Sequence, residues 1–245
     1  MADAARLEEI RCSDAWQRAY AEAEPLVTVR IATWNNAELL IERALTSVRA
    51  QAYERWEAIV VGDACTDDTA ERIAALGDKR IRFHNRAFRG PYPADPQERW
   101  LVAGIPGMNL GADLAAGAWI APLDEDDEWT PDHLDVLLAA ALAERAELAY
   151  GRLRGLHHDP PISIEIGAYP PQRGDFGFQG ALYNAALREF RYELSCRLTG
   201  EPGDWHLARR MWEAGVRFTY VDRVVATWHV ERGIEDWFRL RAQAS

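Results

Sequence analysis

The chain has 245 residues, of which 28 are basic and 39 are acidic, and its formal net charge is −11. This length and a hydrophobic content of 48% suit one domain with a sizeable core. The acidic balance and the lack of any Lys/Arg run exclude a duplex nucleic-acid partner, because such binding depends on a basic face.

The first 85 residues alternate between helical and strand patterns. We expect a helical segment at 1–24 ended by Pro25, a strand at 27–31, a helix at 39–48 with Asn36 as its N-cap, a buried strand at 58–61, a helix at 69–76 and a strand at 80–83. This order favours an α/β fold with a mostly parallel sheet flanked by helices. A single domain is predicted from residue 25 to residue 245.

The remaining residues predict further elements of both kinds. We expect an irregular loop at 86–107, a helix at 107–116, a strand at 119–123, a helix at 130–145, a strand at 148–153, a loop at 155–177, a helix at 204–214, and strands at 217–221 and 224–228. The pair His157-His158 falls in the second loop and is expected to bind no metal.

Three polar segments follow predicted strands: 33–35, Asp63 with its turn, and 124–127. Ligands of open α/β sheets bind outside the carboxyl ends of the strands, so these segments should converge. Four adjacent acids repel one another unless water or a cation offsets their charge. Carboxylates of this kind suit Mn²⁺ or Mg²⁺ held together with a diphosphate. The alternative is a solvated acidic turn that caps the next helix.

Four segments in this order, 27–35, 59–69, 109–120 and 123–134, resemble the inverting family 2 glycosyltransferases with the GT-A fold. The resemblance covers roughly residues 25–230. It implies a Rossmann-like sheet, with a donor half at 25–130 and an acceptor half at 131–245 that includes a C-terminal extension.

The resemblance also implies a role for each matching residue. The residues implied are Thr33, Asn35, Asp63, Asn109, Asp124 and Glu125 at the nucleotide sugar, Asp126 with Asp124 and His229 at the metal, and Asp204 as the catalytic base. Met108 replaces an Arg of the family pattern, so Arg86 or Arg89 is expected to supply a phosphate contact. Pro202-Gly203 interrupts the downstream motif, which leaves Glu201 as a second candidate base. Trp205 is the candidate acceptor platform.

The implied activity is a metal-dependent inverting transfer of a hexosyl or related sugar. The donor is a nucleotide-diphosphate sugar, with UDP favoured, and the acceptor is a hydroxyl of a glycan, a lipid-linked molecule or a small molecule. A nucleotidyltransferase is one alternative. Such an enzyme would usually carry a Gly-rich phosphate loop with a Lys or Arg after the first strand, but 33–38 holds neither glycine nor a basic residue. A non-catalytic GT-A-like domain that binds a sugar or a protein is the other, against which the acids at 124, 126 and 204 argue. Asp204 as a mere helix cap and His229 as a structural residue also stay open.

The expected location of the protein is the cytoplasm. No apolar run approaches the ~18–20 residues that a membrane span needs, and the acidic start of the chain is unlike a signal peptide. Cys12, Cys65 and Cys196 are widely spaced, which indicates a reducing compartment. Peripheral contact with the inner face of a membrane stays open, as does the oligomeric state.

Overall fold

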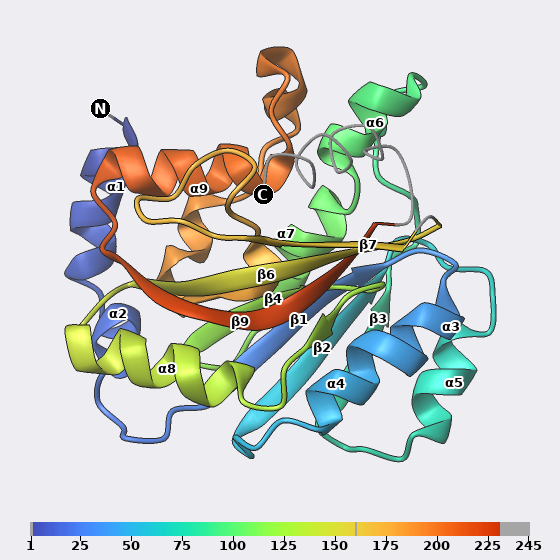
Figure 1. Cartoon of the computed structure of the whole chain (residues 1–245), viewed down its shortest axis with the longest axis horizontal. Helices are drawn as coiled ribbons and strands as arrows, with labels where there is room; N and C mark the ends of the chain where they lie inside the picture. The colour runs from blue at the N-terminus through green and yellow to red at the C-terminus, as the bar shows by residue number, and fades with distance from the viewer. Residues whose placement is uncertain (1, 160, 231–245) are drawn as a thin grey trace.

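The computed structural model describes residues 2–159 and 161–230, which form a three-layer α/β molecule with one sheet between two layers of helices (Figure 1). The strand order is β3-β2-β1-β4-β8-β6-β9-β5, and β7 pairs with β6. The strands are β1 Val27–Thr33, β2 Trp56–Gly62, β3 Ile81–Asn85, β4 Trp119–Asp124, β5 Glu128–Trp129, β6 Leu148–His158, β7 Pro161–Ile166, β8 Ala181–Asn184 and β9 Phe218–Val230.

The helices connect these strands and cover both faces of the sheet. They are α1 Ala2–Arg11, α2 Asp14–Arg18, α3 Ala37–Leu39, the π-helical turn η1 Leu40–Leu45, α4 Thr46–Arg49, α5 Thr69–Ala75, α6 Pro96–Val102, α7 Ile105–Leu114, α8 His133–Glu144, the 3₁₀ turns η2 Phe178–Gly180, η3 Ala185–Phe190 and η4 Leu194–Thr199, and α9 Gly203–Ala214. The predicted α/β fold with a mostly parallel sheet flanked by helices is confirmed, and β3, β2, β1 and β4 all pair in parallel.

Each face of the sheet has its own apolar core, which follows from the alternation of side chains along a strand. On β1, Val27, Val29 and Ile31 pack against α4 and α8 in the first core. Residues of α1, α7 and α9 form a second core on the opposite face, around Ile120 and Tyr150. Because both faces are covered, a charged side chain on β1 lies inside the protein.

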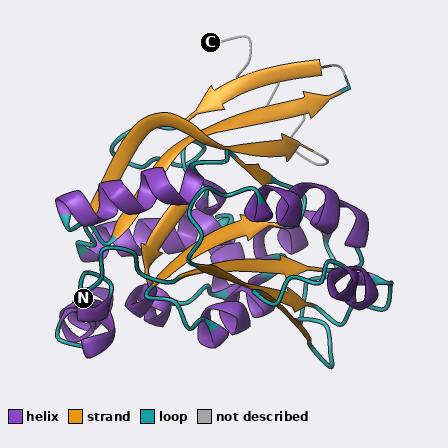
Figure 2. Cartoon of the chain, turned by 90° about the horizontal axis from the view of Figure 1, so that it is seen from below, coloured by secondary structure: helices purple, strands orange, loops and turns teal. Residues whose placement is uncertain are grey.

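The second half of the sheet curls away from the first. β8 runs antiparallel to both β4 and β6, and β6 then pairs in parallel with β9 from Leu148↔Phe218 to His157↔Val230. A bulge opposite Gly151 and Arg152 bends this long pair. Figure 2 shows the resulting curvature, with the long strands bending out of the plane of the others.

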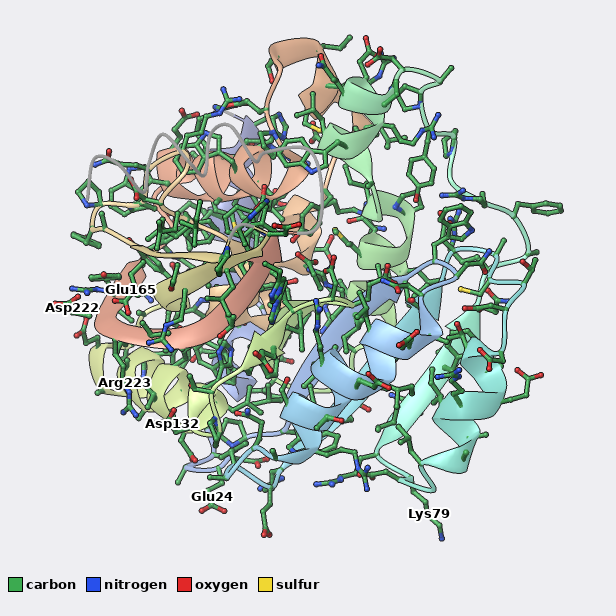
Figure 3. The ribbon with its side chains drawn as sticks, turned by 45° about the vertical axis from the view of Figure 1, so that its right-hand side comes forward. Glu24, Lys79, Asp132, Glu165, Asp222 and Arg223 are labelled. Atoms are coloured by element: carbon green, nitrogen blue, oxygen red, sulfur yellow. The ribbon has the colours of Figure 1, made fainter. Side chains whose placement is uncertain are left out.

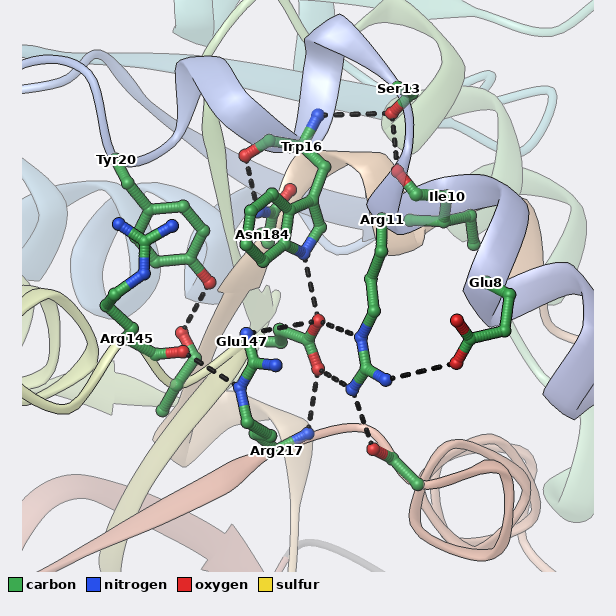
Figure 4. A network of polar contacts seen from close by, with 12 residues as sticks. Glu8, Ile10, Arg11, Ser13, Trp16, Tyr20, Arg145, Glu147, Asn184 and Arg217 are labelled. Atoms are coloured by element: carbon green, nitrogen blue, oxygen red, sulfur yellow. Dashed lines mark hydrogen bonds and ion pairs between the residues drawn. The ribbon is translucent and has the colours of Figure 1, made fainter.

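The N-terminal segment forms two short helices on the α9 side of the molecule rather than one helix. Ser13 caps α2 by accepting a hydrogen bond from the amide of Trp16, so the chain turns between the helices. The docked segment surrounds Glu147, which is fully buried (Figure 4). Arg11 donates to both of its oxygens at 2.8 and 2.9 Å, and Trp16 Nε1 donates at 2.9 Å.

Four sequence predictions were wrong, and each error has a local cause. The region 155–166 is not a loop, because β6 continues to His158 and turns into β7, where pairing overrides the polar composition. The predicted strands at 217–221 and 224–228 are one strand, β9, with a bulge. The segment 86–107 contains α6, which Asp95 caps. Asn36 makes no capping bond and instead donates to Glu125.

None of the helices in the described residues is long and apolar enough to cross a membrane. Cys12, Cys65 and Cys196 are all free thiols.

Candidate functional site

The three polar segments predicted to converge lie side by side at the carboxyl edge of the parallel strands. Thr33 pairs with Gly62 across β1 and β2, and Ala32 pairs with Asp124 across β1 and β4. The amide of Asp63 donates to the carbonyl of Thr33 at 2.8 Å. This strand register, fixed by the apolar cores beneath it, creates the site.

Asp63 lies almost fully buried at one end of this edge. Arg86 pairs with one of its oxygens, the amide of Gly90 donates to the same oxygen at 3.1 Å, and Arg89 Nε lies 3.7 Å from the other oxygen. The Arg89 guanidinium stacks over the Trp34 ring at 3.4 Å. Trp34 is 44% exposed, so one aromatic surface beside Asp63 is open to solvent.

Two predicted ligand contacts hold protein segments together. Asn35 accepts from the amide of Thr66 at 2.8 Å, which joins the turns after β1 and β2. Asn109 on α7 donates to the carbonyl of Tyr192 and accepts from its amide, both at 3.0 Å. In this structure these side chains shape the site through other residues.

Glu125, in the acidic turn after β4, makes hydrogen bonds to the turn after β1. Glu125 accepts from the amide of Trp34 at 2.9 Å and from Asn36 Nδ2 at 3.2 Å. Burial raises the pKa of Glu125 to about 7, although these hydrogen bonds oppose the rise. Glu125 therefore ties the acidic turn to the turn after β1.

Asp126 and Asp127 continue the turn. Asp127 is 1% exposed and accepts from the amide of His229 at 2.9 Å. Burial raises the pKa of Asp127 well above its usual range, and the charges of Asp126 and Asp124 add to the rise. Arg43 donates to the carbonyl of Asp126 at 3.1 Å. Asp127 thus joins the turn to β9, and the local negative charge favours a cation beside Asp126.

The negative charge of Asp204 acts on Asp124, although the two residues come from opposite halves of the chain. Burial raises the pKa of Asp124, Arg30 opposes that rise, and the negative charge of Asp204 adds to it. Burial likewise raises the pKa of Asp204. Protein atoms surround the Asp124 side chain, although the side chain itself stays exposed to solvent at this edge of the sheet. Neither carboxylate forms an ion pair within residues 2–159 and 161–230.

The two candidate bases differ in their partners. Asp204, in the first turn of α9, accepts a hydrogen bond from the amide of Trp205 at 2.6 Å. Glu201 is bound by Arg209 through two bonds of 2.8 Å, and this contact lowers the pKa of Glu201. Glu201 is therefore committed to an ion pair, whereas Asp204 is available. Trp205 is half-buried against the second core.

His229 makes protein contacts through both ring nitrogens. Its Nε2 lies 3.2 Å from Glu128 Oε1, and its Nδ1 lies 3.0 Å from His158 Nε2. Burial lowers the pKa of His229. A metal contact from His229 would require one of these bonds to open. His158 reaches His229 because His157-His158 ends β6 beside β9.

The donor set of the acidic turn fits a divalent cation. Among the residues that the structure describes, no group of three or more His, Cys, Asp or Glu side chains forms a ready-made metal cage. Mg²⁺ and similar ions in nucleotide sites commonly take one or two carboxylates and complete their shell with phosphate oxygens and water. Asp126 and Asp124 could supply those carboxylates.

Two cavities flank the sheet at opposite edges. One of about 630 Å³ is lined by Arg86, Asn109 and Tyr192, which also border the site just described. The other, of about 740 Å³, lies near the amino ends of β1 and β4, beside Leu26 and Gly117. Asp124, Asp126 and Asp204 are not among the residues that line these two cavities.

Sequence analysis missed Arg30 and Tyr192. Arg30 is 1% exposed in the middle of β1, and its Nη2 donates to the hydroxyl of Tyr192 at 3.1 Å. The available signal was a single charge inside the apolar alternation of a central strand. Tyr192 had no comparable signal, because its role depends on a contact across 162 residues.

Comparisons with known proteins agree with this architecture. A family model described as Glycosyl transferase family 2 matches residues 28–94 and 100–159. The succinoglycan biosynthesis protein ExoO of Rhizobium meliloti is 35% identical over 130 residues, which are 53% of this chain and 33% of that protein. The chain spans 33% to 41% of the length of the first curated relatives that it matches.

Two solved structures share the fold. S. aureus TarS 1–349 in complex with UDP aligns with a TM-score of 0.62 and 15% identity, over 88% of this chain and 63% of that chain. The mannosyltransferase PcManGT of Pyrobaculum calidifontis, in complex with GDP-Man and Mn²⁺, aligns with a TM-score of 0.61 and 18% identity, over 98% and 69%. The GT-A-like fold predicted from the sequence is confirmed. Since the family model covers more than half of the chain, this protein belongs to glycosyl transferase family 2.

Proposed function

We propose that the chain is a metal-dependent inverting glycosyltransferase that moves a sugar from a nucleotide-diphosphate sugar to an acceptor hydroxyl. The observation that carries the proposal is the placement of Asp204 within electrostatic reach of Asp124, at the carboxyl edge where Asp63 also lies. Two carboxylates without ion-pair partners there suit two tasks, one on the acceptor and one on the donor.

Asp204 is the proposed base. In an inverting transfer the acceptor hydroxyl attacks the anomeric carbon from the side opposite the leaving diphosphate, and the hydroxyl proton must go to a nearby group. Burial raises the pKa of Asp204, which makes its carboxylate a better proton acceptor. General-base help of this kind is worth about 10²–10⁴-fold in rate. The ion pair of Glu201 with Arg209 leaves Asp204 as the better candidate.

Asp126 and Asp124 are the residues that would hold Mn²⁺ or Mg²⁺. When bound, the ion offsets the negative charge that grows on the leaving diphosphate. The Mn²⁺ and GDP-Man in the PcManGT structure support metal use on this fold. The surrounding acids serve as scaffold, since Glu125 holds the Trp34 turn and Asp127 holds β9.

The nucleoside end of the donor is proposed to lie over Trp34 and Asp63. The exposed Trp34 ring, backed by Arg89, gives a flat surface for a base, and the Asp63 carboxylate accepts hydrogen bonds. The UDP bound in the TarS structure supports a UDP-sugar donor. Arg86 and Arg89 both face Asp63, so either can turn toward a phosphate when a donor enters.

A thermal-shift experiment tests this proposal. Nucleoside diphosphates would be screened with Mn²⁺, with Mg²⁺ and with a chelator, and we expect a selective, metal-dependent rise in the unfolding midpoint. A ligand at 100 times its Kd adds about 2.7 kcal/mol to the unfolding free energy. Asp126→Asn should abolish the metal-dependent part of the rise. Asp222→Asn, which changes a carboxylate at the outer edge of the molecule (Figure 3), should leave it intact. A shift that ignores metal, or that survives Asp126→Asn, would contradict the metal assignment.

A further inference from the structure

Arg30 is a charged side chain in the interior of the protein. It lies in the middle of β1, between the parallel neighbours β2 and β4, and is 1% exposed. Burying a guanidinium is costly unless bonds and opposite charges compensate it. The fold nevertheless makes room for this side chain, since a Cβ added at Gly111 of α7 would lie 2.7 Å from Arg30 Cγ.

The compensation that the protein provides for Arg30 is incomplete. Nη2 donates to the Tyr192 hydroxyl at 3.1 Å, and the guanidinium lies 5.3 Å from the centre of the same ring. Nε and Nη1 have no hydrogen-bond partner anywhere in residues 2–159 and 161–230. Arg30 therefore carries a positive charge that only partly serves the packing around it.

The position of Arg30 relates this charge to Asp124. Ala32 pairs with Asp124 across β1 and β4, so Asp124, Ala32 and Arg30 share one face of the sheet. Arg30 is thus a buried cation on the same face of the sheet as Asp124.

The other contact of Arg30 reaches the segment that carries the proposed base. Tyr192 lies at the start of the stretch that runs through η4 to Asp204. Its backbone is held by Asn109 of α7 through two bonds of 3.0 Å, and its hydroxyl is held by Arg30. Arg30 and Asn109 together attach this stretch to the donor half of the molecule.

We propose that Arg30 is a positioning residue that couples the two halves of the transfer site, through its charge to Asp124 and through Tyr192 to the segment that bears Asp204. This inference rests on the function proposed above. Arg30 touches neither donor nor acceptor; it sets the relative placement of the carboxylates that do. A displacement of about 1 Å at such a site can reduce a rate by about 10²-fold.

The test compares Arg30→Met, Arg30→Lys and Tyr192→Phe with the unchanged protein. Arg188→Met is the matched control, because Arg188 is also an arginine that packs against α7, but it donates to the carbonyls of Ala112 and Ala115 and not to Tyr192. The measurements are the unfolding midpoint, the Kd of a nucleoside diphosphate with Mn²⁺, and kcat and KM for sugar transfer.

We expect Arg30→Met to weaken nucleotide binding about tenfold and to lower kcat about 100-fold, by the same positional argument. Arg30→Lys, which keeps the charge, should recover most of the binding but not the kcat. Tyr192→Phe should lower kcat without changing the Kd, and its effect should be smaller in the Arg30→Met background, because residues in one network do not act additively.

Three outcomes would overturn the inference. The first is a folded Arg30→Met protein with unchanged kcat, and the second is an equal loss of kcat in Arg188→Met. If Arg30→Met does not fold, the decision rests on the other two variants, and an unchanged kcat in both is the third outcome. The proposed function is judged separately on the unchanged protein: an absence of metal-dependent nucleotide binding there refutes that function and this inference with it, whereas binding without transfer refutes the transfer step and leaves the Kd comparison to decide the role of Arg30.

Discussion

Glu147 is fully buried and Asp204 is half-buried, and their surroundings shift the pKa values of the two carboxyl groups in opposite directions. Burial alone would raise the pKa of Glu147, yet the bonds from Arg11, the amide of Arg217 and Trp16 hold it below its usual range. Asp204 has the amide of Trp205 and no ion pair in the described part of the chain, and burial raises its pKa. The difference separates a carboxylate bound up in the packing of the fold from the one that we propose as the base.

The same contrast holds between the region around Glu147 and the carboxyl edge of β1 and β4. At Glu147, three segments that are distant in sequence meet: the N-terminal helices, the start of β6 and the start of β9. Both carboxylate oxygens of Glu147 accept hydrogen bonds there (Figure 4). At the carboxyl edge of β1 and β4, burial and mutual repulsion raise the pKa values of Asp124, Glu125 and Asp127. The second arrangement lowers stability by itself, and a bound cation or ligand would relieve it.

Replacing Asp204 by Asn should have the largest effect on the rate of sugar transfer. An unchanged rate would show that Asp204 does not differ from Glu147 in the way described above. We expect transfer to fall by about 10²–10⁴-fold, because the acceptor proton loses its receiver. The unfolding free energy should stay equal or rise at neutral pH, since a buried charge is removed. Steady-state kinetics measures the transfer rate, and chemical denaturation measures the unfolding free energy. Unchanged transfer would remove Asp204 as the base, and Glu201→Gln would then be the variant to measure.

Replacing Glu147 by Gln should have the opposite profile. We expect a loss of about 3 kcal/mol in unfolding free energy, because the Arg11 guanidinium loses its buried partner. The protein that remains folded should keep its kcat, since Glu147 belongs to the N-terminal docking network. Denaturant unfolding and active-site titration would separate the two quantities. A fall in kcat without a loss of stability would show that the network serves chemistry after all.

Replacing Glu125 by Gln tests how the carboxylates at the edge of β1 and β4 affect stability, through the pH dependence of the unfolding free energy. The pKa of Glu125 in the folded protein is raised to about 7 from an ordinary value near 4.5. Its proton therefore stabilises the fold fully below about pH 4, and this contribution is lost as pH rises through 7. Gln imitates the protonated form, so we expect the variant to be about 3 kcal/mol more stable than the parent at pH 8 and equal to it at pH 4. Equal stability at both pH values would mean that Glu125 titrates normally.

Replacing Arg89 by Ala should give the smallest effect. The stacking of its guanidinium on Trp34 is partly exposed, and such contacts contribute about 0.5–1 kcal/mol. We expect nucleotide affinity to fall only a few-fold, as isothermal titration would measure. Arg72→Ala, at an exposed arginine paired with Asp68, is the control and should leave the affinity unchanged. A loss larger than tenfold would indicate that Arg89 reaches the phosphates directly.

The sequence was sufficient for those features that depend on local patterns. The alternation of Val27, Val29 and Ile31 and the apolar run at 58–61 predict β1 and β2, and the polar residues that follow them predict the converging edge. Parallel register then brings these ends together without further information. The family motifs cover the same strands, so both lines of argument locate Asp124.

Features that depend on distant contacts were not accessible from local patterns. The polar stretch of β6 and β7 is a strand pair because each segment supplies the other's hydrogen bonds. Asn36 has the sequence position of a helix cap, but its side-chain amide donates to Glu125, which is 89 residues away. The availability of Asp204, against the ion pair of Glu201 with Arg209, also becomes visible only in three dimensions.

The docking of the N-terminal helices has a consequence for the order of assembly during synthesis. Asp3 pairs with Arg210 and Arg11 pairs with Glu147, so the partners of α1 emerge from the ribosome 136 to 207 residues later. At about 5–20 residues per second, this delay is on the order of ten seconds. Until then the apolar side chains of Leu7, Ile10 and Trp16 have no core to enter. Helices α1 and α2 are thus made well before the segments that they pack against, and they reach their final place only after those segments have emerged.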